Sequence, residues 1–463
     1  MSDLLPSLAA LLGPAGLLTG ADITAYCTDW RGLYQGRALA VARPADTAQL
    51  AALVRFCGQA RLPMVPQGGN TSMVGGATPD ESGQALIISL ARMNRLRDID
   101  PLDMSMTVEA GLTLRAAQQE ASQRGCLLPL SIAAEGSATI GGVLATNAGG
   151  NNTVRYGNAR DLLLGIEAVL PDGSVLSALR RLRKDNTGYA LRHLLAGSEG
   201  TLGIITAAVL RLAPLPGTLD VALCAVPDPA AALALFARLR QAATIQAFEY
   251  MSGTGMALVL AHIHGASLPL AAPAPHYALV EVADGGPALV SVLEAALEEG
   301  LVTDAALAQS EAQRAAIWRL REEHAEAQRL AGASVKNDVS VPVSRVPALI
   351  AQASAAVSAL LPGVRPVPFG HVGDGNVHMN FLRPDAMNDV AFLLHADEIM
   401  HATAEVVRGL DGSFSAEHGI GRLKTGMMAQ WRGGAELAAM RRIKTALDPL
   451  GLMNPGKMLP PSA

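Results

Sequence analysis

Two glycine-dense segments constrain the fold of this 463-residue chain more than any other feature. The first, PQGGNTSMVGG, follows the run Leu62 to Val65, which predicts a strand, and the second is IAAEGSATIGGVLATNAGGNN. Glycine permits close approach of the backbone, and successive N–H groups in a loop free of Cβ atoms form a concavity for anions such as pyrophosphate. The first segment has neither the P-loop nor the G-x-G-x-x-G spacing, so a Walker or Rossmann site is not expected.

The residues around the first loop predict alternating helices and strands. Asp46 or Thr47 can cap a helix whose apolar residues fall at helical spacing as far as Cys57. Further strands are predicted at residues 83–90 and 105–110, and a helix at residues 112–124.

The composition changes after Arg211, where LAPLPGTLD predicts a linker. The next segment is Ala-rich with helical periodicity at residues 228–240 and 288–299, interleaved with strands such as HYALVEV. This alternation predicts an α+β domain with helices on one face of an antiparallel sheet.

Charge and cysteine content limit the partners and the compartment. The net charge is −5 and the Lys and Arg residues are scattered, which favours a small-molecule partner over nucleic acid or an anionic membrane. The four cysteines are far apart and form no C-x-x-C pair, which argues against disulfides, structural zinc and an iron–sulfur domain.

No stretch approaches roughly 20 uninterrupted apolar residues, and the amino terminus lacks a basic leader. We therefore expect a cytoplasmic protein without a transmembrane segment.

A metal site is indicated in the second half by FGHVGDGNVHMN, residues 369–380. If residues 374–375 form a two-residue type I′ turn, His371 faces His378 with Cβ atoms about 5 Å apart. SAEHGIG supplies a third ligand type, Glu417, beside His418. Two imidazoles and a carboxylate suit a divalent ion that keeps an open position.

From Arg43 to Leu212 the motifs resemble the FAD-binding domain of vanillyl-alcohol-oxidase-type flavoproteins, since several occur in the same order. The resemblance implies FAD held without a covalent tether, because the first loop contains no His. The cofactor-binding residues that it implies are Pro66, Gln67, Gly68, Gly69, Asn70, Thr71, Ser72 and Gly75 in the first loop, Gly136, Thr139, Gly141, Gly142, Ala145 and Asn147 in the second, Glu199, Gly200, Gly203 and Ile204 in GSEGTLGIIT, and Asn454 near the end.

The second half resembles the FAD-linked D-2-hydroxy-acid dehydrogenases, and among them the D-2-hydroxyglutarate dehydrogenases. This resemblance implies Zn²⁺ or a similar divalent metal and a small 2-hydroxy-acid substrate. The matching residues are His371, His378 and Glu417 as metal ligands, His418 as catalytic base and substrate contact, and Arg321, Lys336 and Asn380 as substrate-binding residues. Ala325 departs from the threonine that is usual in the family.

The two resemblances together imply an α+β protein that oxidises D-2-hydroxyglutarate to 2-oxoglutarate by hydride transfer to FAD. They imply an FAD-binding domain at residues 1–215, a substrate (cap) domain with an antiparallel sheet and the metal site at 216–420, and a C-terminal segment at 421–463 that packs back on the FAD domain. We expect a separate electron acceptor, either an electron-transfer flavoprotein or a quinone, and a homodimer as in relatives.

Three alternatives stay open from the sequence. The first is a D-lactate or glycolate dehydrogenase of the same family, which a substrate panel would distinguish. The second is a flavin-binding subunit without activity, which would be yellow but inactive. The third is a metal-binding or carbohydrate-binding protein without flavin, which would be colourless.

Overall fold

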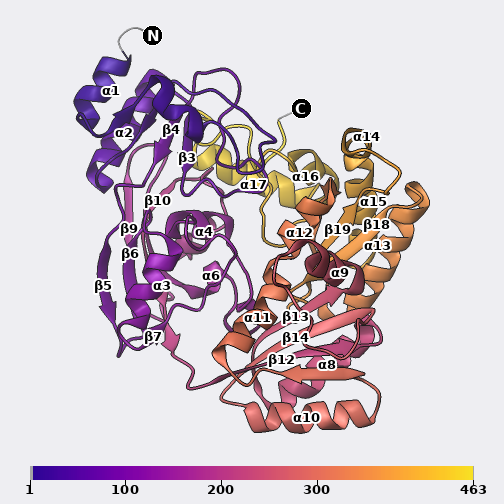
Figure 1. Cartoon of the computed structure of the whole chain (residues 1–463). Helices are drawn as coiled ribbons and strands as arrows, with labels where there is room; N and C mark the ends of the chain where they lie inside the picture. The colour runs from indigo at the N-terminus through magenta and orange to yellow at the C-terminus, as the bar shows by residue number, and fades with distance from the viewer. Residues whose placement is uncertain (1–3, 462–463) are drawn as a thin grey trace. The chain divides into compact units, whose positions relative to one another are not determined.

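The computed structural model describes residues 4–461 and divides into two compact units. The first unit contains the described residues up to Gly149, Gly157–Leu215 and the chain from His418 onward (Figure 1). The second contains Gly150–Tyr156 and Pro216–Glu417. Two details differ from the predicted domains, because residues 150–156 group with the second unit and the last segment begins at 418 instead of 421.

The first of these differences has a local cause in helix α5, Thr153–Tyr156. The guanidinium of Arg155 donates a hydrogen bond of 2.7 Å to the Gln246 side chain, which lies on a strand of the second unit. The helix is thereby held by the second unit, although the chain on both sides of it belongs to the first.

The first unit is built on two main sheets. In the four-stranded sheet, of order β1-β2-β4-β3, the strands β2, β4 and β3 run parallel. The five-stranded sheet, of order β5-β6-β10-β8-β9, is antiparallel, and β7 pairs with β11 apart from both. The strands are β1 Leu17–Leu18, β2 Ala40–Ala42, β3 Met64–Gln67, β4 Leu86–Ser89, β5 Leu96–Asp100, β6 Ser105–Glu109, β7 Cys126–Leu127, β8 Leu163–Val169, β9 Val175–Ala178, β10 Ile204–Arg211 and β11 Ala213–Pro214.

Helices α2, α3 and α4 of this unit begin at residues whose side chains cap them. Asp46 caps α2 by accepting a 2.8 Å hydrogen bond from the Gln49 N–H, and the predicted apolar positions of α2 are buried. The helical elements are α1 Leu4–Leu12, η1 Gly20–Tyr26, α2 Thr47–Ala60, α3 Leu114–Ser122, α4 Ile140–Thr146, α6 Ala159–Leu162, α7 Leu191–Leu195, α16 Thr425–Trp431 and α17 Ala435–Leu447.

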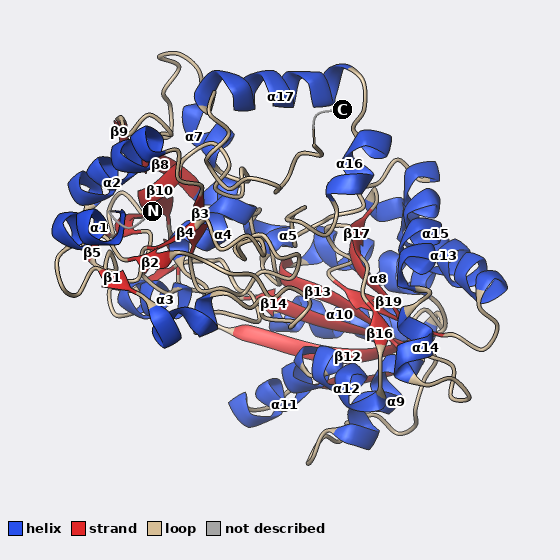
Figure 2. Cartoon of the chain, turned by 90° about the horizontal axis from the view of Figure 1, so that it is seen from above, coloured by secondary structure: helices blue, strands red, loops and turns tan. Residues whose placement is uncertain are grey.

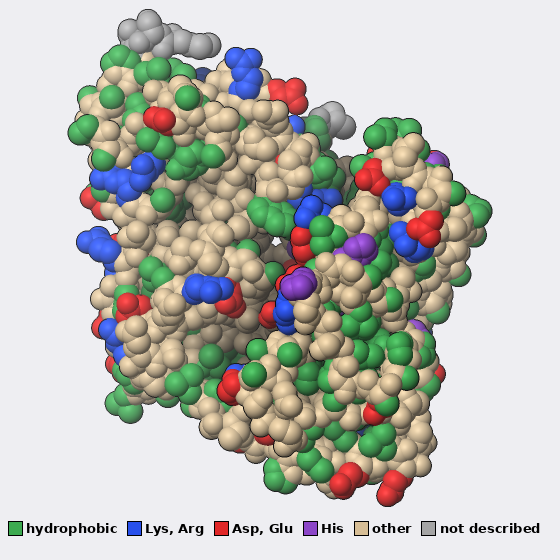
Figure 3. Space-filling model, viewed as in Figure 1, with side chains coloured by type: hydrophobic (Ala, Val, Ile, Leu, Met, Phe, Trp, Pro, Cys, Tyr) green, Lys and Arg blue, Asp and Glu red, His purple; other side chains and the backbone are tan. Residues whose placement is uncertain are grey.

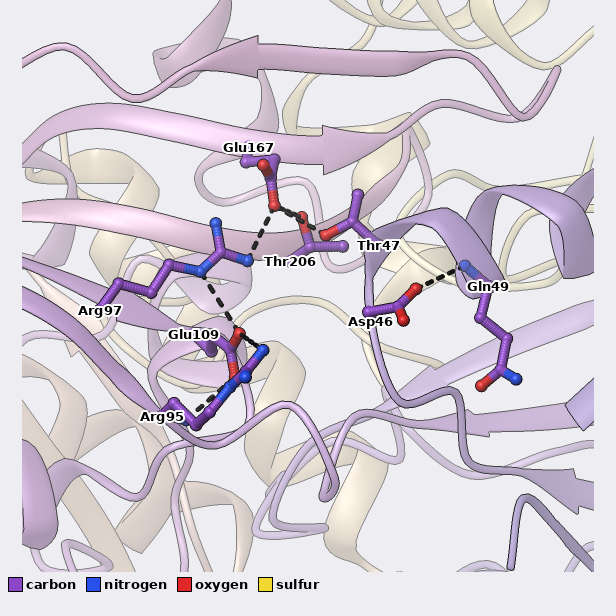
Figure 4. Close-up of polar contacts among 8 residues, drawn as sticks. All are labelled: Asp46, Thr47, Gln49, Arg95, Arg97, Glu109, Glu167 and Thr206. Atoms are coloured by element: carbon purple, nitrogen blue, oxygen red, sulfur yellow. Dashed lines mark hydrogen bonds and ion pairs between the residues drawn. The ribbon is translucent and has the colours of Figure 1, made fainter. Parts of the chain in front are cut away.

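A polar network ties the start of α2 to the five-stranded sheet (Figure 4). The Glu167 carboxylate on β8 accepts hydrogen bonds from the hydroxyls of Thr47, at 2.7 Å, and Thr206, at 2.9 Å. It also pairs with Arg97 at 3.2 Å, and Arg97 in turn reaches Glu109 on β6 at 3.3 Å (Figure 4). Each acid is thus surrounded by donors, as a carboxylate in a sheet interior requires.

The C-terminal segment joins the parallel sheet of the first unit. Met453 forms an isolated parallel bridge with Met64 of β3, and the Met64 N–H donates to the Leu452 carbonyl at 2.8 Å. The half-buried side chain of Lys444 donates from its ammonium to the carbonyls of Thr201 and Met453, each at 2.8 Å. These bonds place residues 452–454 beside the strand that leads into the first glycine loop.

The second unit contains an antiparallel sheet of order β15-β12-β14-β13-β18-β19-β16, with β17 also paired to β19. Its strands are β12 Leu219–Val226, β13 Thr244–Ser252, β14 His276–Ala283, β15 Asp304–Leu307, β16 Ser334–Val335, β17 Asp338–Ser340, β18 Arg365–Gly370 and β19 Asn376–Leu382. Its helices are α5, α8 Pro229–Ala242, α9 Gly253–His262, α10 Gly286–Glu298, α11 Glu311–Glu322, α12 His324–Ala331, η2 Val343–Arg345, α13 Val346–Leu360, α14 Asp389–Leu393 and α15 Ala396–Gly409.

Helices cover both faces of this sheet, so the predicted one-sided arrangement was wrong (Figure 2). Along β12, Ala222 and Cys224 pack into the core with α8, α10 and α13, whereas Val221 and Leu223 pack into a second core with α9, α11 and α12. Strands that are apolar on both faces need cover on both sides. The mixed helix and sheet composition is α+β, as predicted.

One helical stretch among the described residues, Val343–Leu360, is long and apolar enough to cross a membrane by length and composition. Core helices of soluble proteins pass the same test. Here the buried residues of α13 recur every three or four positions and contribute to a core of the second unit, while Arg345 and Gln352 interrupt the apolar run. This pattern fits a helix that packs on a sheet.

Charged side chains are dispersed on the face shown in Figure 3, where Lys and Arg alternate with Asp and Glu and gather into no large basic patch. The described residues also form local ion pairs, such as Arg124 with Glu120 and Arg329 with Glu326. The view agrees with the scattered charge pattern of the sequence.

The Glu167 network yields a stability prediction. Glu167→Ala should lower the free energy of unfolding by about 1–3 kcal/mol, because the fully buried Thr206 hydroxyl loses its acceptor. Urea unfolding compared with wild type checks this. Glu120→Ala, which removes an exposed pair with Arg124, is the control and should cost about 0.5 kcal/mol or less. Equal effects of the two substitutions would contradict the importance assigned to Glu167.

Candidate active site

The two glycine-rich segments of the first unit lie against each other. A Cβ atom on Gly68 would stand 2.5 Å from the Thr139 hydroxyl, and one on Gly69 would stand 1.9 Å from the Ser137 carbonyl oxygen. Both separations are far below contact distance, so only glycine fits at these positions without movement of the neighbouring loop. The close packing of the two segments therefore requires glycine at both positions.

Side chains hold the first loop in shape and leave its backbone donors open. The Gln67 amide donates to two backbone carbonyls at 2.8 and 2.9 Å, and Asn70, at φ 53°, donates to the Thr28 carbonyl at 2.8 Å. The Ser72 hydroxyl accepts from a later N–H of the same loop at 3.1 Å. Within the described part of the chain, the N–H groups of residues 69–71 donate to no protein acceptor. A fixed loop with open N–H groups fits a pyrophosphate.

The second glycine segment forms α4 and its two ends. Thr139 caps the helix by accepting from the Gly142 N–H at 3.4 Å. A Cβ atom on Gly141 would stand 2.8 Å from Ala110, which explains the absence of a side chain there. Asn147 ends the helix in the left-handed region, at φ 52°.

Asn454 connects two of the predicted cofactor-binding segments. Its side-chain amide donates to the carbonyls of Glu199, at 2.7 Å, and Gly76, at 3.0 Å. The buried Glu199 carboxylate accepts from the N–H groups of Ile420, at 2.7 Å, and Gly421, at 2.8 Å. Burial raises the pKa of Glu199, and these N–H donors act in the opposite direction.

The remaining predicted cofactor-binding residues also belong to the first unit. They are Pro66 in β3, Thr71 and Gly75 in the first loop, Gly136 before α4, Ala145 within α4, Gly200 and Gly203 with positive φ before β10, and Ile204 at the start of β10. Their contacts with FAD stay a prediction.

In the second unit, the hairpin of β18 and β19 differs from the predicted one. His378 pairs with Phe369, not with His371, so the register is shifted by two residues. Five residues, 371–375, connect the two strands, where a two-residue turn was expected. A shift of two keeps each side chain on its predicted face of the sheet, whereas a shift of one would reverse it.

The longer loop has a physical cause in its own hydrogen bonds. The His371 carbonyl accepts from the N–H groups of Asp374 and Asn376, both at 3.2 Å. Only Gly375 has positive φ, at 91°, whereas a type I′ turn requires positive φ at Asp374 as well. The Asn376 amide also donates to the Val339 carbonyl of β17 at 2.9 Å, which anchors the loop to a strand that the hairpin pattern did not reveal.

The three predicted metal ligands nevertheless come together. One ligand atom each of His371, His378 and Glu417 lies within 4.8 Å of the others. The two imidazole rings are 5.5 Å apart between centroids and stand edge to face at 79°, and His371 Nε2 lies 3.9 Å from Glu417 Oε1. Two imidazoles and one carboxylate that converge in this way fit a divalent ion with an open coordination position.

Asp338, which the sequence did not single out, supports two of these ligands. It lies on β17 opposite His378, whose Nδ1 is 3.5 Å from Asp338 Oδ1. Its second oxygen accepts the Glu417 N–H at 2.8 Å. The carboxylate therefore holds the backbone that carries Glu417 and lies close to the His378 ring.

Glu249 is a second residue that the sequence did not reveal. This fully buried side chain on β13 accepts from His371 Nδ1 at 2.7 Å with one oxygen and from Arg321 Nε at 2.7 Å with the other. Burial alone would raise the pKa of Glu249, but the charges of His371 and Arg321 and their hydrogen bonds lower it to about 2. Glu249 is therefore ionised at neutral pH.

The surrounding carboxylates create a negative field at His371. Burial alone would lower the pKa of His371, but Glu249 and Glu417 raise it to about 9. A site that favours a proton on an imidazole also favours a metal cation, which has to displace that proton to bind. The electrostatics are those expected around a cation site.

The predicted substrate-binding residues Arg321, Lys336 and Asn380 lie in the same unit, whereas His418 belongs to the first unit. Arg321 on α11 is 7% exposed, and its guanidinium stacks 4.9 Å from the centre of the Phe369 ring. The buried Asn380 on β19 donates its amide to Gln328 at 2.9 Å. Lys336 is half-buried between β16 and β17. His418 follows Glu417 directly and is also half-buried, and its role as base stays a prediction.

The chain matches two protein-family models, the FAD binding domain at residues 38–178 and the C-terminal domain of FAD linked oxidases at residues 215–458. Two similar solved structures are 4-ethylphenol oxidase from Gulosibacter chungangensis, with a TM-score of 0.75, and alkyldihydroxyacetonephosphate synthase, also with 0.75. Each is 17% identical, and they cover 99% and 98% of this chain and 97% and 84% of theirs. The fold is that of vanillyl-alcohol-oxidase-type FAD enzymes.

Several similar proteins carry names that specify a substrate. A D-2-hydroxyglutarate dehydrogenase of Xanthomonas citri pv. viticola is 40% identical over 95% of this chain and 93% of its own length. The mitochondrial D-2-hydroxyglutarate dehydrogenase of Bos taurus is 40% identical over 94% and 79%, and a putative mitochondrial D-lactate dehydrogenase of Schizosaccharomyces pombe is 34% identical over 94% and 85%. The chain belongs to the FAD-linked D-2-hydroxy-acid dehydrogenases and is an FAD-dependent oxidoreductase.

The packing of the glycine loops predicts an effect on flavin content. Gly69→Ala should lower the ratio of bound FAD to protein, because its Cβ atom has no room beside the Ser137 carbonyl and the loop must move. The ratio of visible flavin absorbance to protein absorbance measures this. Gly58→Ala in α2 is the control, since no atom lies within 4 Å of the added Cβ. Full flavin content in the Gly69 variant would contradict the proposed role of the first glycine loop in FAD binding.

Proposed function

We propose that this enzyme oxidises D-2-hydroxyglutarate to 2-oxoglutarate with FAD and a divalent metal, Zn²⁺ or similar. The observation that carries the proposal is the convergence of His371, His378 and Glu417 in the unit that also holds the buried Arg321. The names of the similar proteins from Xanthomonas citri pv. viticola and Bos taurus support the same substrate.

The metal site would be formed by His371, His378 and Glu417. A divalent ion held there supplies Lewis-acid polarisation of the hydroxyl and carboxylate oxygens of a 2-hydroxy acid. The three side chains leave room for these substrate oxygens because they provide fewer ligands than a closed structural site.

Oxidation removes a proton from the substrate hydroxyl and a hydride from its C2 carbon. His418 takes the proton in this proposal, because an imidazole titrates near neutral pH. FAD supplies the hydride acceptor when bound. Arg321 binds a substrate carboxylate through its two terminal nitrogens, since its Nε is bonded to Glu249. Asn380 contributes a further polar contact.

Two cationic residues favour a dicarboxylate over a monocarboxylate. Arg321 and Lys336 provide one positive charge more than lactate or glycolate needs. D-Lactate or another D-2-hydroxy acid is the second candidate, because the Schizosaccharomyces pombe protein has that name and Ala325 replaces the usual threonine.

The electron acceptor, oligomeric state and location complete the proposal. The sequence has neither a nicotinamide-binding motif nor closely spaced cysteines, so we expect electrons to leave to an electron-transfer flavoprotein or a quinone. A cytoplasmic homodimer is proposed on the grounds given for the sequence, although the similar proteins from Bos taurus and Schizosaccharomyces pombe are named mitochondrial.

The metal site is tested by His378→Ala. Turnover should fall to background and the bound divalent metal should be lost, because one of three ligands is removed, while the FAD content stays at the wild-type level. Elemental analysis, visible absorbance and steady-state turnover measure these three quantities. His262→Ala, an exposed histidine on α9, is the control. Unchanged turnover in the His378 variant would remove the metal from the mechanism.

The substrate is tested by anaerobic bleaching of the flavin. D-2-Hydroxyglutarate should bleach it faster than D-lactate or glycolate, and the L-acids should bleach it slowly or not at all. Prior treatment with a chelator should slow bleaching by every acid, and added Zn²⁺ or Mn²⁺ should restore it. Faster bleaching by D-lactate than by D-2-hydroxyglutarate would contradict the proposed substrate and favour D-lactate instead.

A further inference from the structure

One buried carboxylate contacts both halves of the proposed substrate site. We propose that Glu249 is a positioning residue that fixes the orientations of His371 and Arg321, so that metal binding and acid binding depend on the same side chain. The inference rests on the proposed function and extends it to a residue that touches neither the metal nor the acid.

The position of Glu249 follows from strand register. Tyr250 pairs with Gly370 between β13 and β18, so the next antiparallel position places Glu249 opposite His371. Directly opposed side chains share a face of the sheet and lie close enough to interact. Glu249 Oε1 accordingly lies 2.7 Å from His371 Nδ1.

This hydrogen bond selects one tautomer of the His371 ring. The Glu249 oxygen accepts from Nδ1, so the ring keeps a proton on Nδ1, and Nε2 is the nitrogen whose lone pair a metal ion can take. Nε2 is the nitrogen that lies 3.9 Å from the Glu417 carboxylate. A carboxylate behind a ligating imidazole fixes the ring and strengthens it as a donor to the metal.

The second oxygen of Glu249 orients Arg321. It accepts from Nε at 2.7 Å, and the two terminal nitrogens of the guanidinium make no hydrogen bond to Glu249. Phe369 packs on the flat face of the guanidinium at 4.9 Å, and the same ring lies 4.9 Å from the His378 ring. The guanidinium is therefore fixed in its plane beside one of the metal ligands.

Charge neutrality gives a simpler alternative, in which Glu249 only offsets the buried charge of Arg321. In that case the hydrogen bond between Glu249 and His371 would have no effect on the affinity for the metal ion. A buried ion pair that is broken is costly to the fold on either account. Only a measurement of metal affinity separates positioning from neutralisation.

The test uses Glu249→Gln in the FAD-loaded, metal-free protein. In glutamine an NH2 group, which donates and cannot accept, replaces one of the two carboxylate oxygens that accept separately from His371 and Arg321. Titration with Zn²⁺ against a competing fluorescent chelator should give a Kd about 10–100-fold higher than in wild type. At saturating metal, the KM for D-2-hydroxyglutarate should also rise, because Arg321 loses its fixed orientation.

The matched control is Glu281→Gln on the neighbouring strand β14. Glu281 is also buried and accepts from Trp318 of α11 at 2.8 Å, and neither His371 nor Arg321 contacts it through a hydrogen bond. Its metal Kd should stay at the wild-type value. Flavin content and circular dichroism confirm folding in both variants.

A second variant covers the case in which Glu249→Gln does not fold. Glu249→Asp keeps the charge but is one methylene shorter, so it cannot reach both partners, and its Zn²⁺ Kd should also rise. A Kd within about threefold of wild type in either folded variant would overturn the positioning role. If wild type itself binds no divalent ion, the proposed metal-dependent function fails instead, so the two failures are distinguishable.

Discussion

The register of neighbouring strands in the second unit is the constraint on which the proposed metal site depends. β13, β18 and β19 lie side by side, and β17 pairs with β19, so Glu249, His371, His378 and Asp338 come from adjacent strands or their ends. A slip of one residue in any pairing would turn its side chain to the opposite face. The cores on both sides of the sheet make such a slip costly, because it would expose apolar side chains and bury polar ones.

The proposed cofactor site of the first unit depends mainly on close packing and open N–H groups of the backbone. Gly68 and Gly69 allow the first loop to lie against residues 137–139, and Asn454 connects that region to Glu199 through backbone carbonyls. The result is a set of fixed loops with N–H groups that a phosphate can use. Glycine density in one loop alone is a weak sign of a phosphate site. Two glycine-rich segments that occur in order along the chain are a stronger sign, because the two lie against each other in the fold.

The sequence predicted those parts of the structure that local interactions determine. α2 begins after the Asp46 cap, and α8 begins after Asp228, whose side chain accepts from the Ala231 N–H at 2.8 Å. The face of the hairpin that carries both histidines was also predicted, because strand alternation alone sets it. The turn between them was predicted wrongly, since its length depends on the contact of Asn376 with β17, which is remote from the turn along the chain.

Long-range features of the site were not predictable in the same way. Glu249 is a single acid in the apolar run TIQAFEYMS. An acid in a buried strand predicts a cationic or hydrogen-bonding partner, but the sequence does not show which residue that partner is. Its partners follow from the strand order β14-β13-β18 and from α11, which covers one of the two faces of the sheet, whereas helices were expected on one face only. The runs LDVALCAV and HYALVEV, apolar at nearly every position, were the available sign that both faces are covered.

The most direct test of the account is anomalous scattering from crystals of the FAD-loaded protein after incubation with Zn²⁺. The account predicts one strong peak per chain at about 2.0–2.2 Å from a nitrogen of His371, a nitrogen of His378 and an oxygen of Glu417. A peak at another set of residues, or a site empty of metal at saturating Zn²⁺, would contradict the central claim that these three side chains bind the catalytic ion.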